Sequence, residues 1–491
     1  MSSIRKLVLH FSHFFGGSAV ILLLGFVTFP ILTRLLTREE YGILGLVTNT
    51  VAIAVALAKG GLSDGIIRFY HDYAATPERM TLFTSTVLTR GVLLAAAVVA
   101  MYLLALPHIN VFVGINPHYL DCFLVMGLYL FVRPLNIIVL NYLRALGKIF
   151  LFNVVNVATK TLGVALAFAL LLWLVGELYG YLLGLALAEI GAAIFLYRWL
   201  LAGHHFSIRR VSRPLTLNLL KFGVPLLLTE LAYLLLSYAD RYMIVAYHGE
   251  AMVGLYSVGY NLPSYLNELI MFSLSYAVVP IYTGLYTREG KEATERFLSR
   301  SFRYYLIGVI PLCLGYWAVA RDLLVVLASP KYADAARFSP LILVGLVFLG
   351  MNSLLYAGLY LEKKSLHILG IMFAAVTVNI LLNFVLLPSY GVMGASIATL
   401  IACMVSTLLM GFWGFRYVRV VIPVATIIYY LAASVLMYVL LIQIDTASGW
   451  LNLLGKIPVG AAVVAIAVLC REAEIRAHTV SLLTKLRQRF A

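Results

Sequence analysis

The chain has 491 residues, of which 63% are hydrophobic and only 12% are charged, with a mean hydropathy of +0.97. A soluble domain is about 45–50% apolar and about 25% charged, so this composition excludes an ordinary soluble fold. The net charge of +15 does not indicate nucleic-acid binding, because the basic residues fall between apolar stretches rather than on one face. The apolar stretches run for about 20 residues without alternation, as membrane-spanning helices do and barrel strands do not. We therefore predict an all-α integral membrane protein.

The apolar stretches predict fourteen transmembrane helices. In chain order they cover 14–36, 42–70, 81–105, 119–143, 150–174, 178–198, 222–247, 251–286, 304–327, 338–361, 366–387, 391–415, 422–441 and 453–470. The first is interpreted as an uncleaved span, since no signal-peptidase site follows it. Pro263 and Pro280 lie inside the eighth span and predict a kink there.

The basic residues between the spans predict the orientation. With the N-terminus inside, most of the 36 Lys and Arg residues lie in cytoplasmic segments, as the positive-inside rule requires. The pattern predicts that both termini are cytoplasmic. It also predicts an N-lobe over 1–200, a cytoplasmic interfacial linker over 201–221 and a C-lobe over 222–415. The last two spans and a basic cytoplasmic tail occupy 416–491.

The two predicted lobes resemble each other weakly. Glu40-Tyr41-Gly42 leads into span two as Met252-Val253-Gly254 leads into span eight, and Tyr179-Gly180 opens span six as Val392-Met393-Gly394-Ala395 opens span twelve. The spacing is roughly 210 residues in each case, as expected of a duplicated unit. Because both repeats begin on the same side, the duplication is parallel rather than inverted. Such halves commonly enclose a central cavity and rock against each other.

Four segments resemble motifs of one transporter family. They are Phe29–Gly42 (FPILTRLLTREEYG), Gly61–Tyr70 (GLSDGIIRFY), Asp240–Tyr242 (DRY) with Val253–Ser257 (VGLYS), and Gly391–Thr399 (GVMGASIAT). In this order they resemble the polysaccharide transporters of the multidrug/oligosaccharidyl-lipid/polysaccharide exporter superfamily, over essentially the whole chain. The sequence lacks the Asp-rich first loop of the lipid II flippase branch.

The resemblance implies two pseudo-symmetric six-helix lobes around a central cavity, plus two C-terminal helices. It implies a flippase that moves a polyprenyl (undecaprenyl)-diphosphate-linked oligosaccharide from the cytoplasmic to the outer leaflet by alternating access, for O-antigen or exopolysaccharide assembly. The partners that it implies are the lipid-linked oligosaccharide, membrane lipids and the glycan polymerase and ligase machinery, with no nucleic acid.

Five basic residues lie inside the predicted spans of the first half. They are Lys59, Arg68, Arg90, Arg133 and Lys160. Each costs about 2.5–3.5 kcal/mol at the centre of a span, so it is expected to face a cavity or a partner. Three of them, Arg90, Arg133 and Lys160, fall at similar depth on the cytoplasmic side of the midplane. We predict that the five bind the substrate diphosphate, since Arg offers a bidentate fork to phosphate and Lys a point charge.

The alternatives for these cations are structural. Asp64 and Arg68 are four residues apart on one helix face and neutralise each other in this alternative, while Arg68 is also close enough to the inner end to snorkel. Lys59 precedes Gly60–Gly61, where the helix can break, so it serves either a cavity or a hinge. The other three cations pair with carboxylates or carbonyls across helices in this alternative.

Buried carboxylates and tyrosines complete the candidate site. Glu230 and Glu268 have no neighbour of opposite charge in the sequence, and with Asp64 they are predicted to couple transport to H⁺ or Na⁺. The alternative is a protonated acid that bonds across helices. Tyr256 and Tyr260 are candidates for stacking on glycan, against the alternative of an interfacial aromatic belt. Asp240-Arg241 is interpreted as a structural pair.

Catalytic and metal motifs are missing from the sequence. It contains no phosphate loop, no His-Glu-x-x-His and no Gly-x-Ser-x-Gly, and its four cysteines form no Cys-x-x-Cys. We therefore expect no cofactor, no metal site and no enzyme activity. Two rivals stay open: a membrane glycan polymerase or ligase, which the short outer loops disfavour, and a cation-coupled multidrug antiporter, which the buried cations of the first half disfavour.

Overall fold

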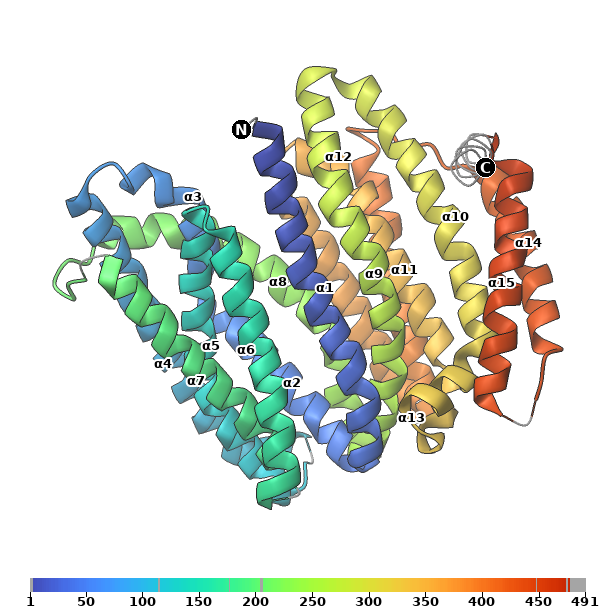
Figure 1. The fold of residues 1–491 in the computed structure, drawn as a ribbon, viewed down its shortest axis with the longest axis horizontal. Coiled ribbons are helices and arrows are strands. Elements are labelled where there is room, and N and C mark those ends of the chain that lie inside the picture. The colour runs from blue at the N-terminus through green and yellow to red at the C-terminus, as the bar shows by residue number, and fades with distance from the viewer. Residues whose placement is uncertain are drawn as a thin grey trace, which may run out of the picture. The chain divides into compact units, whose positions relative to one another are not determined.

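The structure is a computed structural model that describes residues 3–113, 115–175, 177–203, 206–446, 448–473 and 476. Within these ranges the regular elements are helices, and no strand occurs (Figure 1). The predicted all-α class is confirmed. The basic tail that the sequence predicts beyond residue 476 lies outside the described residues.

The helices follow the predicted spans closely. Their bounds are α1 Ser3–Leu35, α2 Arg38–Lys59, α3 Leu62–Tyr73, α4 Pro77–Val113, α5 Leu120–Ala145, α6 Ile149–Leu170, α7 Leu178–Gly203, α8 Arg213–His248, α9 Glu250–Arg288, α10 Lys291–Leu323, α11 Ser339–Leu355, α12 Ala357–Leu361, α13 Ser365–Gly414, α14 Val424–Ile442 and α15 Gly449–Arg471. Short 3₁₀ segments, Pro117–Tyr119 and Pro330–Arg337, and π segments, Leu171–Val175 and Leu324–Ala328, join some of them.

Ten helices in the described ranges are long and apolar enough to span a membrane, with one more if Pro330–Arg337 and Ser339–Leu355, bent by 58°, form one span. Two predicted spans, 366–387 and 391–415, are both contained in α13, which is interrupted by the non-helical Gly391. Another, 42–70, is divided into α2 and α3. The count of fourteen therefore stays a prediction, while the membrane-spanning class is confirmed.

Contacts within the chain define two compact units. The first contains Met1–Ser257 and Met372–Ala395, and the second contains Val258–Ile371 and Ser396–Ala491. The predicted lobes, 1–200 and 222–415, stay a prediction. Within the predicted linker, α8 begins at Arg213, where the Ser212 side chain accepts a hydrogen bond from the Leu215 amide as an N-cap.

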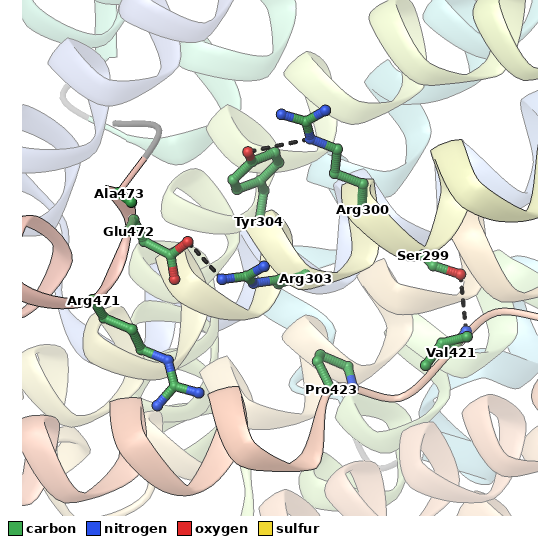
Figure 2. Close-up of a pocket in the computed structure, with 9 residues that line it drawn as sticks. All are labelled: Ser299, Arg300, Arg303, Tyr304, Val421, Pro423, Arg471, Glu472 and Ala473. Carbon is green, nitrogen blue, oxygen red and sulfur yellow. Dashed lines mark hydrogen bonds and ion pairs between the residues drawn. The ribbon is translucent and has the colours of Figure 1, made fainter. Parts of the chain in front are cut away.

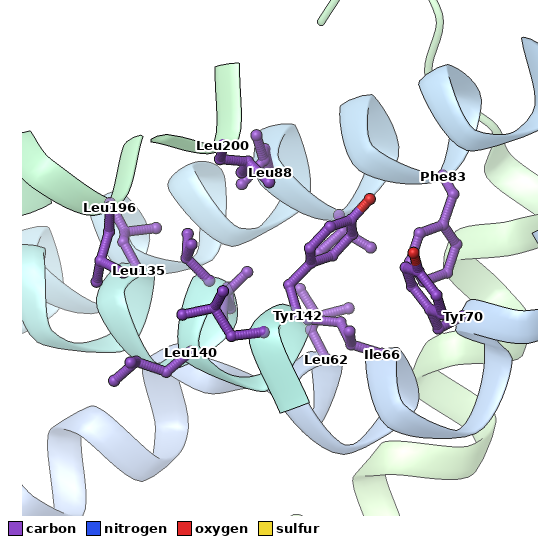
Figure 3. Packing of buried hydrophobic residues seen from close by; sticks show 14 of the residues in the cluster. Leu62, Ile66, Tyr70, Phe83, Leu88, Leu135, Leu140, Tyr142, Leu196 and Leu200 are labelled. Atoms are coloured by element: carbon purple, nitrogen blue, oxygen red, sulfur yellow. The ribbon is translucent and has the colours of Figure 1, made fainter. Parts of the chain in front are cut away.

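The first unit is held by a large apolar cluster among α3, α4, α5, α6, α7 and α8 (Figure 3). Leu62, Ile66 and Phe83 are fully buried in it. The Tyr142 hydroxyl donates to the Met80 sulfur at 3.2 Å, and its ring meets Tyr70 edge-on with centroids 5.2 Å apart. This packing fixes the start of α3 and the middle of α4, which carry several of the predicted site residues.

The second unit packs α14 and α15 against α10. Tyr430 of α14 is fully buried beside Ile307 of α10 and Ala467 of α15. Further along, Lys456 of α15 donates to Asp322 of α10 at 2.7 Å, and both side chains are largely buried. The last two helices are thus fastened to α10 at both ends of their length.

Candidate functional site

A break between α2 and α3 places Lys59 at the end of a helix. Gly60 and Gly61 both have positive φ, 55° and 70°, a conformation that favours glycine. A Cβ on Gly61 would collide with the backbone of Gly223 in α8. The two glycines therefore end α2, start α3 in a new direction and let α8 approach closely. The predicted helix break after Lys59 is confirmed.

Lys59 forms an ion pair with Glu230 of α8. Its ammonium donates to the two carboxylate oxygens at 2.7 and 2.9 Å, and the Lys59 side chain is 14% exposed against 40% for Glu230. The sequence offers Glu230 no partner nearby, because Lys59 is 171 residues away. The structure therefore supplies the counter-charge that a lone intramembrane carboxylate lacks.

Asp64 and Arg68 lie one helical turn apart on α3 but form no ion pair in the described part of the chain. Asp64 is half-buried, and its carboxylate accepts a hydrogen bond from Ser63 at 3.5 Å. Arg68 is exposed, with its guanidinium carbon 5.6 Å from the Phe69 ring centroid. The geometry does not support mutual neutralisation of the two side chains, and it leaves Arg68 at the surface of the unit.

Arg133 of α5 is tied to Glu189 of α7. Its guanidinium donates to the Glu189 carboxylate at 3.0 Å, and Glu189 is 3% exposed. Asn136, one turn along α5, donates to the same carboxylate at 2.8 Å and to the Glu189 carbonyl at 2.9 Å. This buried network joins two packed helices. It matches the alternative in which Arg133 pairs across helices. The sequence predicts no role for Asn136, which is the third member of the network.

Arg90 and Lys160 form no ion pair in the residues that the structure describes. Arg90 is half-buried, and its Nε donates to the Thr216 hydroxyl at 3.3 Å. Its side chain lines a cavity of about 250 Å³ between α3, α4 and α8, with Leu62, Leu93, Leu94, Thr216 and Leu220 as the other walls. Lys160 is half-buried on α6. Neither cation is thus compensated by a carboxylate in the described residues, and their role in binding stays a prediction.

The two predicted stacking tyrosines are buried. Tyr256 is fully buried, its hydroxyl donates to the Asp240 carboxylate, and its ring centroid lies 5.5 Å from the Arg241 guanidinium carbon. Tyr260 is 6% exposed. Asp240 and Arg241 are themselves buried, as expected of a structural pair. Neither tyrosine presents an open ring face here, so glycan stacking stays a prediction.

Glu268, the remaining predicted coupling residue, is exposed on α9. It belongs to the second unit, whereas Glu230 and Asp64 belong to the first. Its role in ion coupling stays a prediction.

Comparison with known proteins identifies the family. The sequence profile described as polysaccharide biosynthesis protein matches residues 12–285, which is more than half of the chain. The chain belongs to the polysaccharide biosynthesis protein family. A second profile, MatE, matches residues 225–385. The two profiles together confirm the predicted membership of the exporter superfamily.

This chain is only distantly related in sequence to the curated proteins that it matches. It is 27% identical over 190 residues to an uncharacterised membrane protein of Methanocaldococcus jannaschii, covering 38% of this chain and 37% of the relative. It is 25% identical to the probable flippase AglR of Haloferax volcanii, in a match that covers 44% of this chain and 41% of the relative. It is 22% identical to the succinoglycan biosynthesis transport protein ExoT of Rhizobium meliloti, in a match that covers 64% of this chain and 60% of the relative. The matches thus span between about a third and two thirds of these relatives' own lengths.

Solved transporter structures share the fold. The lipid II flippase MurJ in an inward-closed conformation gives a TM-score of 0.77 at 15% identity, covering 95% of this chain and 99% of that chain. An inward-facing MATE-family multidrug resistance transporter of the MOP superfamily gives a TM-score of 0.67 at 17% identity, covering 81% of this chain and 93% of that chain. At these identities the likeness establishes the fold alone.

Proposed function

We propose that this chain is a flippase that carries a polyprenyl-diphosphate-linked oligosaccharide from the cytoplasmic to the outer leaflet. The observation that carries the proposal is the set of intramembrane cations in the first unit, of which Arg90 and Lys160 have no ion-pair partner in the described residues. Family membership supports it, as do the names of two relatives, a probable flippase and a succinoglycan transport protein. Such cations are costly in a bilayer unless a ligand or cavity compensates them.

The two unpaired cations are the proposed ligands of the diphosphate. Arg90 offers a fork of donors that matches phosphate oxygens, and Lys160 adds a compact charge. Arg133 has a secondary role in the proposal, because its guanidinium already donates to the buried Glu189 carboxylate, to which Asn136 also donates. Arg68, at the surface of α3, is proposed to attract the headgroup before it reaches the other cations.

Lys59 and Glu230 are proposed to link substrate binding to movement. A diphosphate that binds Lys59 competes with Glu230 for the same ammonium and releases that carboxylate. The freed carboxylate is then able to take up H⁺ or Na⁺, together with Asp64 and Glu268. If the double variant Glu230→Gln, Glu268→Gln transports at the normal rate with unchanged ion dependence, this coupling is wrong.

In this proposal, the chain takes part in glycan export and lies in a bacterial cytoplasmic membrane, with both of its termini in the cytoplasm. The lobes rock in alternating access, and the lipid tail stays in the bilayer while the glycan crosses in the lumen. The product then passes to polymerase and ligase machinery of O-antigen or exopolysaccharide assembly. The proposed activity is transport rather than an enzymatic reaction.

A second candidate is cation-coupled multidrug antiport, which the MatE match over 225–385 favours. Organic cations bind acidic cavities, whereas the first unit offers unpaired Arg90 and Lys160. Uptake of a lipophilic organic cation into proteoliposomes against a H⁺ or Na⁺ gradient distinguishes the two. The flippase proposal predicts no such uptake.

The test of the diphosphate site compares single variants in a flipping assay. Arg90→Ala and Lys160→Ala are expected to lower the flipping rate by about 10-fold or more each, the scale of a lost charge-assisted hydrogen bond of 1.5–3 kcal/mol. Arg198→Ala, a cation at the end of a span and outside the proposed site, serves as the control. Normal flipping by both site variants would contradict the site and leave the flippase itself standing.

A further inference from the structure

The cavity beside Arg90 combines one charge with apolar walls. Its volume is about 250 Å³, and it lies between α3, α4 and α8 within the first unit. Four of the six side chains that line it are leucines, namely Leu62, Leu93, Leu94 and Leu220, and the other two are Arg90 and Thr216. Leu62 is fully buried in the apolar cluster of the unit, so this wall is fixed by the core.

Thr216 orients the Arg90 side chain in the cavity wall. The Arg90 Nε donates to the Thr216 hydroxyl at 3.3 Å, and that hydroxyl donates in turn to the Ser212 carbonyl at 2.8 Å. The two terminal nitrogens of Arg90 have no acceptor in the described part of the chain. A guanidinium that is held by its Nε presents these two nitrogens as a fork, which matches two oxygens of one phosphate.

The arginine of this cavity differs from Arg303 in the second unit. Arg303 lines the cavity shown in Figure 2, and its guanidinium donates to the Glu472 carboxylate at 2.6 Å. The charge of Arg303 is thus compensated inside its own unit. Arg90 has a neutral hydroxyl partner and no carboxylate among the residues that the structure describes. A ligand phosphate would supply the missing counter-charge within the span.

The polar and apolar walls follow one another along two helices. On α4, Leu94 lies one turn after Arg90, and on α8, Leu220 lies one turn after Thr216. In the predicted orientation both helices start on the cytoplasmic side, so the two leucines lie deeper in the bilayer than their polar neighbours. A lipid of the inner leaflet has the same order, with its phosphate nearer the surface and its hydrocarbon toward the midplane.

The short step from charge to leucine distinguishes two kinds of phosphorylated lipid. In a prenyl diphosphate the hydrocarbon begins at the carbon that is bonded to the phosphate oxygen. In a glycerophospholipid, glycerol and two ester groups separate the phosphate from the acyl chains. Those esters would lose water against leucine walls without gaining a hydrogen bond, which is costly. The cavity therefore fits the prenyl diphosphate better.

We propose that this cavity binds the junction between the diphosphate and the first isoprene units of a prenyl diphosphate. Arg90 donates to the phosphate next to the chain, and the leucines enclose the branched hydrocarbon. A volume of about 250 Å³ has room for the first units only, so the rest of the chain stays in the bilayer. The inference rests on the proposed function and adds that this site recognises the carrier lipid rather than the glycan.

Equilibrium binding of geranyl diphosphate to the purified full chain in detergent tests the proposal. This probe carries two isoprene units and no glycan. It is expected to bind at least about 10-fold more tightly than inorganic diphosphate, because the leucines bury several of its carbon atoms. Arg90→Gln is expected to weaken both ligands by about 10-fold. Arg198→Gln, which removes an exposed cation outside the cavity, is expected to change neither.

Leu93→Phe tests the apolar wall separately. Leu93 is 53% exposed, so the fold is expected to accept a larger side chain that fills part of the cavity. The variant is expected to bind geranyl diphosphate about 10-fold more weakly and inorganic diphosphate as before. Leu104→Phe is the matched control, since Leu104 is 74% exposed on the same helix and lies outside the cavity. It is expected to keep the full preference.

The outcomes separate this site from the proposed transport. Equal binding of the two diphosphates, or a preference that survives in Leu93→Phe, would overturn the site, as would unchanged geranyl diphosphate binding by Arg90→Gln. Phosphatidylglycerol that binds as tightly as geranyl diphosphate would overturn the assignment to a prenyl carrier. A chain that shows the preference but does not flip supports the site and contradicts the flippase. A chain that flips without the preference contradicts the site alone.

Discussion

Four intramembrane cations of the first unit carry the same charge but face different surroundings. Arg133 donates to a buried carboxylate that also accepts from the Asn136 amide, and Lys59 donates to a partly exposed carboxylate. Arg90 has a hydroxyl partner, and Lys160 has no ion pair in the described residues. A buried carboxylate partner already compensates the charge of a cation. Replacing that cation by a neutral residue therefore leaves the carboxylate buried and unpaired. In the proposed function, a buried carboxylate partner therefore separates the structural role of Arg133 from the ligand-binding roles of Arg90 and Lys160.

Arg133→Met is expected to destabilise the fold, whereas Lys160→Met is not. The first variant leaves Glu189 buried without its counter-charge, at a cost of about 3–5 kcal/mol in the free energy of unfolding. The second removes a charge without a carboxylate partner, so its cost is expected to stay below about 1 kcal/mol. Unfolding of the purified variants in mixed micelles measures both. Equal stability of the two variants would contradict the assigned roles.

Lys59 and Glu230 are expected to be coupled in transport. Lys59→Met and Glu230→Gln each break the pair, and the charge-swapped double variant Lys59→Glu, Glu230→Lys re-forms it. A double-mutant cycle on stability is expected to give a coupling free energy of about 1–3 kcal/mol, the range for side chains in direct contact. If the swapped protein is stable but does not transport, the position of the positive charge matters for the substrate. Additive effects in the cycle would show that the pair does not form.

At the scale of the helices, close contacts depend on glycines. Gly61 meets Gly223 across α3 and α8, and a Cβ on either would overlap the other's backbone. In the same unit a Cβ on Gly42 would collide with the Glu250 carbonyl, and its second neighbour is the Gly254 amide. Gly42 and Gly254 are the positions that the sequence repeat treats as equivalent. These two glycines are thus in direct contact, while the predicted duplication stays a prediction.

Gly223→Ala is expected to lower stability strongly, because its Cβ meets backbone atoms that cannot rotate away. Overpacking typically costs about 1–3 kcal/mol, and rigid backbone contacts lie at the upper end. Gly191→Ala in α7 is the matched control, since nothing lies within 4 Å of the added Cβ. Thermal unfolding in detergent compares the two. A Gly223→Ala protein as stable as the control would contradict the close approach of α8 to the α2–α3 break.

The sequence predicts elements of this fold better than it predicts contacts between them. Continuous apolar runs place the helices, and Gly60-Gly61 indicates the break after Lys59, because both are local properties of the chain. Pairing of Lys59 with Glu230, or of Arg133 with Glu189, depends on how helices rotate against each other. No local pattern encodes that rotation, so the sequence alone indicates no counter-charge for Glu230. In the network of Arg133, Glu189 and Asn136, the member close to Arg133 in the sequence is Asn136, three residues later.

At the scale of the whole molecule, the family supports the proposed activity. The chain belongs to a polysaccharide biosynthesis family, and its first unit carries the cations that we propose as ligands of a diphosphate. Composition and apolar periodicity predict the membrane-spanning class because they are averages over many residues. The identity of the glycan depends on a few side chains that line the transport path. Composition and periodicity are averages over many residues, so they do not identify those side chains.

The most direct measurement is translocation by the wild-type chain in proteoliposomes. A labelled polyprenyl-diphosphate oligosaccharide is incorporated, and its appearance in the opposite leaflet is detected by an enzyme that cannot cross the membrane. The proposed function predicts protein-dependent translocation of the diphosphate substrate and a much slower rate for the same glycan on a monophosphate carrier. Translocation no faster than in protein-free liposomes, for several glycans and under both H⁺ and Na⁺ gradients, would contradict the flippase.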